Sequence, residues 1–163
     1  MSKWFFTAAV LLLSACGQAG APSGPAARAD ACKMLGDTAA LFGKDAVAQN
    51  DGGVDDMAGY CRVQSADARL AGDVIVYDGG AKPAAERVAE AISKWDGFTE
   101  TPLAPVEGLG DEAQIALNLP GAQTQIVFRK GEKVVLIAAN SGDPAITGED
   151  LARRMAKAAA AAP

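Results

Sequence analysis

The fold is decided by the stretch TQIVFRKGEKVVLIAA, residues 124–139. In its first half, Ile126 and Phe128 alternate with mostly polar neighbours, which is the two-residue period of a strand with one buried face. Residues 130–133, Lys-Gly-Glu-Lys, have the composition of a tight turn. Residues 134–139 are apolar on both faces, which predicts a strand at the centre of a sheet. The stretch therefore predicts a β-hairpin at the heart of the domain.

Further strands are expected on the N-terminal side of this hairpin. Residues 113–119 alternate apolar and polar side chains, so they extend the hairpin to a three-stranded antiparallel meander. Residues 60–65 and 72–77 are rich in Val, Ile and Tyr and predict two more strands. Residues 98–103 predict a short edge strand. The residues from 105 to 112 are rich in turn formers and predict a loop.

About three helices are expected beside the sheet. The first begins at Asp30 and ends at Gly43, because apolar residues recur at helical spacing between them. The second begins at Pro83 and ends at Gly97. The third begins at Thr147, where a capping box with Asp150 is predicted. The element order α-β-β-α-(β)-β-β-β-α predicts an α+β fold, an antiparallel sheet with a β-meander packed against these helices.

The N-terminal residues predict export. Lys3 precedes a short apolar run from Phe5 to Leu13, and small residues follow, so residues 1–15 have the three zones of a signal peptide. The run is too short for the roughly 20 residues that cross a bilayer as a helix. If the cysteine at position 16 is there by chance, the protein is an ordinary secreted protein.

The residues Leu13-Ser14-Ala15-Cys16 resemble the lipobox of bacterial lipoproteins. This resemblance implies that the signal peptide is removed before Cys16, that Cys16 carries lipid (palmitate among its acyl chains), and that the protein is held on a membrane of the cell envelope. Gly17 after the cysteine implies an outer-membrane location facing the periplasm in a Gram-negative host. Two or three acyl chains anchor a protein stably, because each buried CH₂ contributes about 0.8 kcal/mol.

The chain after the signal peptide divides into a tether and one domain. Residues 16–29 are rich in Gly, Ala and Pro without apolar periodicity, which predicts a flexible tether with a reach of about 20 Å. Residues 30–163 have the length of a single domain. Cys32 and Cys61 remain as an even pair in an oxidising compartment, so we expect a disulfide between them. A redox or metal pair is the alternative, but a CxxC spacing is absent from the sequence.

Composition and motifs argue against several classes of function. The net charge is −5 and Lys and Arg are not clustered, so nucleic-acid binding is not expected. The chain has no histidine, which removes the usual base of a nucleophilic hydrolase and the usual zinc ligand. The aspartates between positions 51 and 56 lack EF-hand spacing, so we expect a polar turn rather than a calcium site. We expect no cofactor and no metal.

The loop before the meander holds the candidate binding residues. Asp111 and Glu112 are adjacent carboxylates, which leaves glycosidase-like hydrolysis as an alternative. We favour recognition without catalysis by Leu109, Asp111 and Glu112, because loops on a braced sheet vary without cost to the core. The alternative for Leu109 is that it folds back onto the core. Residues 78–82 are a second candidate loop.

The segment Gly108-Leu109-Gly110-Asp111-Glu112-Ala113, together with the hairpin of residues 128–137, resembles a pattern in uncharacterised envelope lipoproteins and extracellular sensor domains. The resemblance implies a binding or sensing module and carries over no functional residue. The sequence therefore predicts a membrane-anchored envelope lipoprotein that binds an envelope protein or small ligand and is not an enzyme. The alternatives are an envelope hydrolase that uses carboxylates and a structural accessory subunit of a membrane complex.

Overall fold

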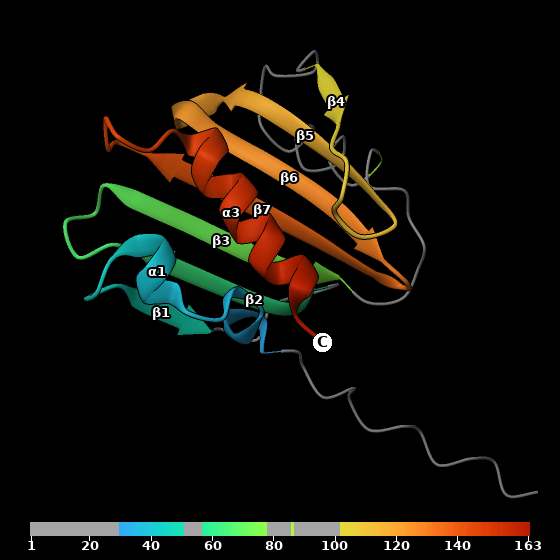
Figure 1. The fold of residues 1–163 in the computed structure, drawn as a ribbon, viewed down its shortest axis with the longest axis horizontal. Coiled ribbons are helices and arrows are strands. Elements are labelled where there is room, and N and C mark those ends of the chain that lie inside the picture. The colour runs from blue at the N-terminus through green and yellow to red at the C-terminus, as the bar shows by residue number, and fades with distance from the viewer. Residues whose placement is uncertain (1–29, 51–56, 78–85, 87–101) are drawn as a thin grey trace, which may run out of the picture.

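The structure is a computed structural model that describes residues 30–50, 57–77, 86 and 102–163. Figure 1 shows these residues as a sheet with helices on one face. The strands are β1 (Val47–Asn50), β2 (Met57–Gln64), β3 (Leu70–Tyr77), β4 (Leu103–Pro105), β5 (Glu112–Leu119), β6 (Gln123–Lys130) and β7 (Lys133–Ser141). The helices are η1 (Ala31–Leu35), α1 (Thr38–Phe42), η2 (Pro120–Ala122) and α3 (Gly148–Ala161).

The seven strands form one antiparallel sheet in the order β1-β2-β3-β7-β6-β5-β4. Strand β7 lies at its centre, as its two apolar faces predicted, and β5, β6 and β7 form the predicted meander. The meander joins the N-terminal strands through β3, which pairs with β7 from Leu70 opposite Ser141 to Tyr77 opposite Val134. An α+β fold built on an antiparallel sheet is thus confirmed.

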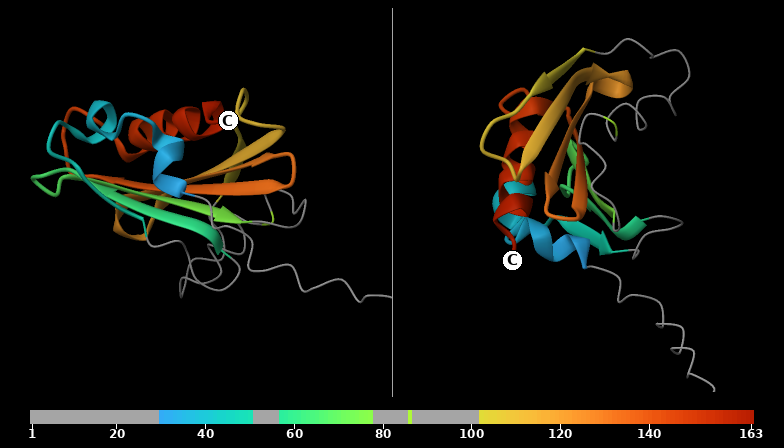
Figure 2. Two further views of the ribbon diagram at one scale, coloured as in Figure 1. Left: turned by 90° about the horizontal axis from the view of Figure 1, so that it is seen from below. Right: turned by 90° about the vertical axis from the view of Figure 1, so that its right-hand side faces the viewer.

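Helices η1, α1 and α3 lie on the same side of the sheet (Figure 2). Helix α3 packs on β6 and β7 and buries Leu151 and Met155 completely. Its start is the predicted capping box: Asp150 N–H donates to Thr147 Oγ1 at 3.0 Å, and the Asp150 carboxylate accepts from Thr147. The main core therefore lies between α3 and the sheet.

The first predicted helix is wrong in its length. Residues 31–42 form two short helices, because Gly36 turns the chain at φ 61° and the Asp37 carboxylate then caps α1 by accepting from the N–H groups of Ala39 and Ala40. The described residues hold two α-helices, where about three were predicted. The second predicted helix falls on residues 83–97, of which only Glu86 is described.

Strand β1 precedes the expected polar turn and lies where no strand was predicted. All four of its residues are exposed, so the sequence holds no alternation to reveal a strand. Main-chain pairing with β2 makes β1 a strand, with Val47 opposite Gln64 and Asn50 opposite Cys61. At the other edge, β4 pairs with β5 and overlaps the end of the predicted edge strand; residues 98–101 lie outside the described part.

Candidate functional site

The predicted binding carboxylates lie at the β6–β7 turn. Asp111 accepts a hydrogen bond from Gly131 N–H at 2.8 Å and another from Arg129 Nη1 at 3.2 Å. Glu112 pairs with the same guanidinium at 3.7 Å, through Nε of Arg129. Both carboxylates therefore hold the loop against the turn. Their role in binding remains a prediction.

Leu109 is buried, with 4% of its surface exposed, and belongs to the main core. The side chain has folded back onto the core, which was the alternative considered from the sequence, so it is not presented to a partner. Gly108 and Gly110 have φ values of 75° and 57°, as the predicted turn requires. Residues 78–82, the second candidate loop, lie outside the described residues.

The predicted disulfide is present. Cys32 of η1 and Cys61 of β2 are joined by an S–S bond of 2.04 Å, and Cys61 is fully buried. The bond fastens η1 to the sheet. Cys16 lies outside the described residues, so lipidation stays a prediction. Among the residues that the structure describes, no helix has the length and apolar character to cross a membrane.

A polar network covers part of the second face of the sheet, opposite α3. Asp73 accepts from Tyr60 Oη at 2.8 Å and from Arg62 Nε at 2.9 Å. The hydrogen bond that Arg62 donates to Asp73, followed by the negative charge of Asp73, raises the pKa of Arg62. With apolar neighbours on β2, β3 and β7 and two glutamines on β6, the network lines a hollow of about 260 Å³. Gln125 Oε1 lies at this hollow, buried and without a donor among the described residues.

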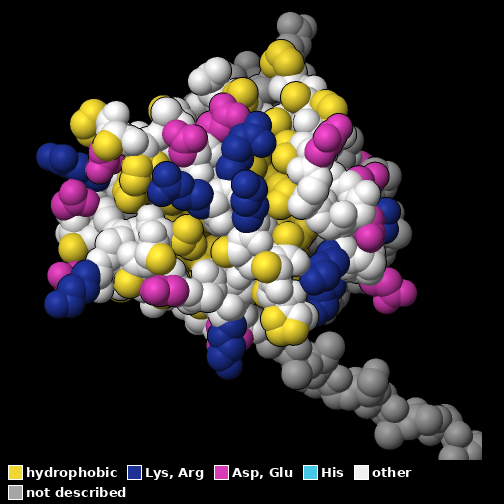
Figure 3. All heavy atoms as spheres, viewed as in Figure 1, with side chains coloured by type: hydrophobic (Ala, Val, Ile, Leu, Met, Phe, Trp, Pro, Cys, Tyr) yellow, Lys and Arg dark blue, Asp and Glu magenta, His cyan; other side chains and the backbone are white. Residues whose placement is uncertain are grey.

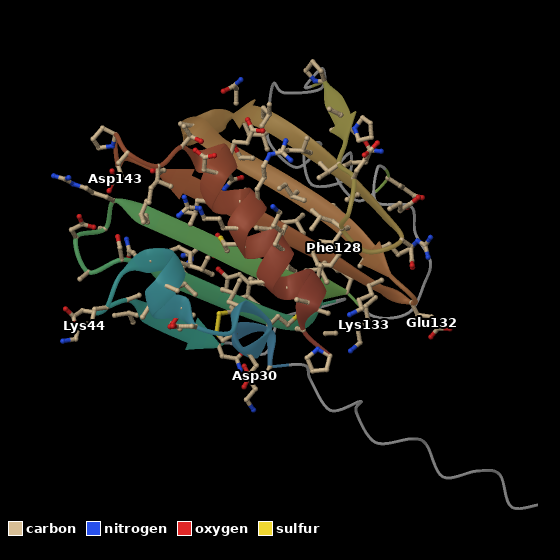
Figure 4. All side chains as sticks on the ribbon, in the orientation of Figure 1. Asp30, Lys44, Phe128, Glu132, Lys133 and Asp143 are labelled. Carbon is tan, nitrogen blue, oxygen red and sulfur yellow. A yellow bond between two sulfur atoms is a disulfide. The ribbon has the colours of Figure 1, made fainter. Side chains whose placement is uncertain are left out.

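A larger hollow of about 370 Å³ opens on the helix-covered side, between the C-terminal end of α3, η1 and the ends of β3, β6 and β7. We call it the lysine pocket. Its lining consists of Asp30, Lys33, Met34, Val76, Phe128, Lys130, Lys133, Val135, Ala159, Ala162 and Pro163. Figure 4 shows Phe128 and Lys133 close together here, with Lys44 and Asp143 at the far end of the molecule. The volume falls in the range of small-ligand sites.

The lysines of this pocket differ in their partners. Lys130 Nζ donates to the carbonyl oxygens of Ala160 at 3.1 Å and Ala162 at 2.9 Å, at the negative end of the α3 dipole. Lys33 pairs with Asp30 at 3.3 Å. Lys133 has neither an ion pair nor a hydrogen bond to any residue in the described ranges. Its ammonium group is therefore available to a ligand.

This pocket was not predicted from the sequence. The pattern that signals it is the pair Lys130 and Lys133 around the Gly131-Glu132 turn: the two lysines are cross-strand partners and project on the same face as Phe128 and Val135. That pattern is visible in the sequence. The roof that α3 and η1 add is not, because it depends on tertiary packing.

No known protein family, curated protein or solved structure matches this chain. The candidate site thus rests on its own geometry. In the part of the chain that the structure describes, no three Cys, Asp or Glu side chains converge in the way that a metal ion would need. Figure 3 shows the helix-covered face with charges of both signs dispersed among exposed hydrophobic side chains.

Proposed function

We propose that this protein is a lipid-anchored lipoprotein of the bacterial cell envelope that binds a small ligand in the lysine pocket without catalysing a reaction. The observation that carries the binding proposal is Lys133: an ammonium group without a partner among the described residues, beside an apolar-walled hollow. The lipobox supports the anchor. Catalysis is not part of the proposal, because Asp111 and Glu112 are engaged with Arg129 rather than aimed at one point.

The position of the pocket supports a role close to the membrane. Asp30, at its edge, is the first described residue after the predicted tether. A tether with a reach of about 20 Å from Cys16 would keep this end of the domain near the lipid surface. The pocket then meets molecules that leave or enter the membrane.

The test uses two adjacent alanines at the end of α3. Ala162 lines the pocket, whereas Ala161 is exposed and does not. The full chain, purified from membranes in mild detergent, is examined by native mass spectrometry for a bound small molecule. We expect the adduct in the wild type and in Ala161→Trp, and we expect its loss in Ala162→Trp, whose indole fills the mouth. An adduct that survives Ala162→Trp, or its absence from all three proteins, contradicts the proposal.

A further inference from the structure

The lysine pocket is amphipathic, which restricts the chemistry of its ligand. Val76, Phe128 and Val135 come from three neighbouring strands and form its floor, and each is at most 1% exposed. These three side chains give the hollow an apolar base. An alkyl chain can lie against this base without leaving a polar group unpaired.

The wall beside the floor is able to adapt. Met34 of η1 is only partly buried and packs against the main core, and Ala159 of α3, which also lines the pocket, has no side chain beyond Cβ. Methionine is unbranched and fills or vacates irregular space at low cost. An alkyl chain would therefore find apolar contacts with the floor residues and with Met34 and Ala159.

The rim carries an electrostatic conflict that an anion would relieve. Lys130 and Lys133 are directly opposite each other at the last register position of the β6–β7 ladder. Like charges in such a pair destabilise a sheet. Lys130 is partly compensated by the carbonyl oxygens at the end of α3, and no described residue compensates Lys133.

The acidic side chain at the rim does not resolve this conflict. Asp30 is occupied by Lys33 at 3.3 Å and by the amide of Asn50 at 2.9 Å. One unused positive charge at the mouth matches one negative charge on the ligand.

We propose that the lysine pocket binds one long-chain carboxylate, with its alkyl chain against Phe128 and Val135 and its carboxylate at Lys133. This inference rests on the proposed function of the same pocket and names the class of its ligand. A double-chain phospholipid is too large for a hollow of about 370 Å³, and a neutral alkyl chain leaves Lys133 without a partner among the described residues.

The experiment uses the full chain in phosphatidylcholine nanodiscs with hexadecanoic acid that carries a diazirine. Illumination should cross-link the probe to peptides that contain Met34 or Phe128. With the probe below saturation, Lys133→Glu should reduce labelling about tenfold, the factor that the loss of one charge-assisted hydrogen bond of about 1.4 kcal/mol gives. Lys133→Arg should retain labelling.

Two controls separate the pocket from general adsorption. Lys44→Glu makes the same change of charge at the opposite end of the molecule (Figure 4) and should leave labelling unchanged. A diazirine alkyl-trimethylammonium probe of equal length should not label the pocket. Equal labelling by the cationic probe, or labelling unaffected by Lys133→Glu, overturns the inference. If such a failure accompanies an adduct that Ala162→Trp removes, the pocket binds another class of ligand and the proposed function stands.

Discussion

Gly72 of β3 lies directly beneath Met155 of α3, so close that a Cβ atom at position 72 would stand 2.5 Å from Met155 Cε and 2.6 Å from its Sδ. The same atom would stand 2.9 Å from Cζ of Phe42. The absence of a side chain at this position therefore sets how closely α3 and α1 approach the sheet. We expect Gly72→Ala to lower the free energy of unfolding by about 1–3 kcal/mol through overpacking.

Urea unfolding of the full chain, followed by circular dichroism, measures this effect. Gly142→Ala is the matched control, because its Cβ would meet nothing closer than the carbonyl oxygen of Arg69 at 3.7 Å. The clash predicts coupling: Gly72→Ala combined with Met155→Ala should destabilise by less than the sum of the two single changes. Additive effects would show that the contact does not limit the packing.

Substitutions of Leu109 and of Asp111 should lower the free energy of unfolding by different amounts. Because Leu109 is buried in the core, Leu109→Ala should cost about 2–5 kcal/mol. Asp111→Ala removes two hydrogen bonds at the β6–β7 turn and should cost about 1 kcal/mol. Glu107→Ala, at an exposed position of the same loop, is the control. Neither Asp111→Ala nor Glu107→Ala should change the adduct in the lysine pocket. Loss of the adduct in Asp111→Ala alone would indicate that the ligand binds at this loop instead.

The Cys32–Cys61 bond should contribute a large share of the stability. It closes a loop with a sequence separation of 29 residues, and the chain-entropy account gives about 3–4 kcal/mol as its upper contribution. Intact-mass analysis without reductant should show two hydrogens fewer than the sequence mass. Alanine at both positions should lower the urea midpoint, and the reduced wild type should behave alike. A midpoint insensitive to reduction would contradict this role.

The capping box of α3 should make stability depend on acidity. Hydrogen bonding to the Thr147 side chain, followed by that to its backbone, lowers the pKa of Asp150. A lowered folded-state pKa means that the ionised carboxylate stabilises the fold above its unfolded pKa, about 3.9, and that this contribution is lost as the pH falls through the folded value. The melting temperature of Asp150→Asn should thus lie below that of the wild type at pH 7, and the difference should shrink only as the pH falls below about 3.9 and through the lowered folded pKa.

Thr147→Val tests the cause of this dependence. It removes the hydroxyl that contributes most to the lowered pKa, so Asp150→Asn should have a smaller effect in that background at pH 7. A difference between wild type and Asp150→Asn that is equal at pH 3 and pH 7 would show that the charge of the carboxylate is not involved.

Membrane attachment should depend on Cys16. Cells fed an alkyne analogue of palmitate should label the wild-type chain and not Cys16→Ser, because the lipobox resemblance places the acyl chains on this residue. Cys16→Ser should also be released from membranes by a salt wash. Equal labelling of both chains would refute the lipid anchor. It would not bear on the carboxylate site, which the cross-linking experiment tests separately.

The strands of the meander and the start of α3 were determined by local sequence. Ile126 and Phe128 alternate with polar residues, residues 134–139 are apolar on both faces, and Thr147 with Asp150 makes a cap from side chains three residues apart. Each signal acts between near neighbours in the chain. The pairing of Cys32 with Cys61 followed from the number of cysteines, since only one pair was available after Cys16.

Tertiary structure alone decided the features that depend on distant segments. Strand β1 has four exposed residues and exists because β2 supplies main-chain partners. The burial of Leu109 depends on the loop folding over the sheet. The lysine pocket needs β3, β6, β7, η1 and α3 together. The sequence places Lys130 and Lys133 on one side of a hairpin, but only tertiary packing brings the end of α3 over them. That packing gives Lys130 a hydrogen-bond partner and leaves Lys133 without one among the described residues. Local patterns set which face a side chain takes, and the contacts that make a binding site form only when the faces of remote elements meet.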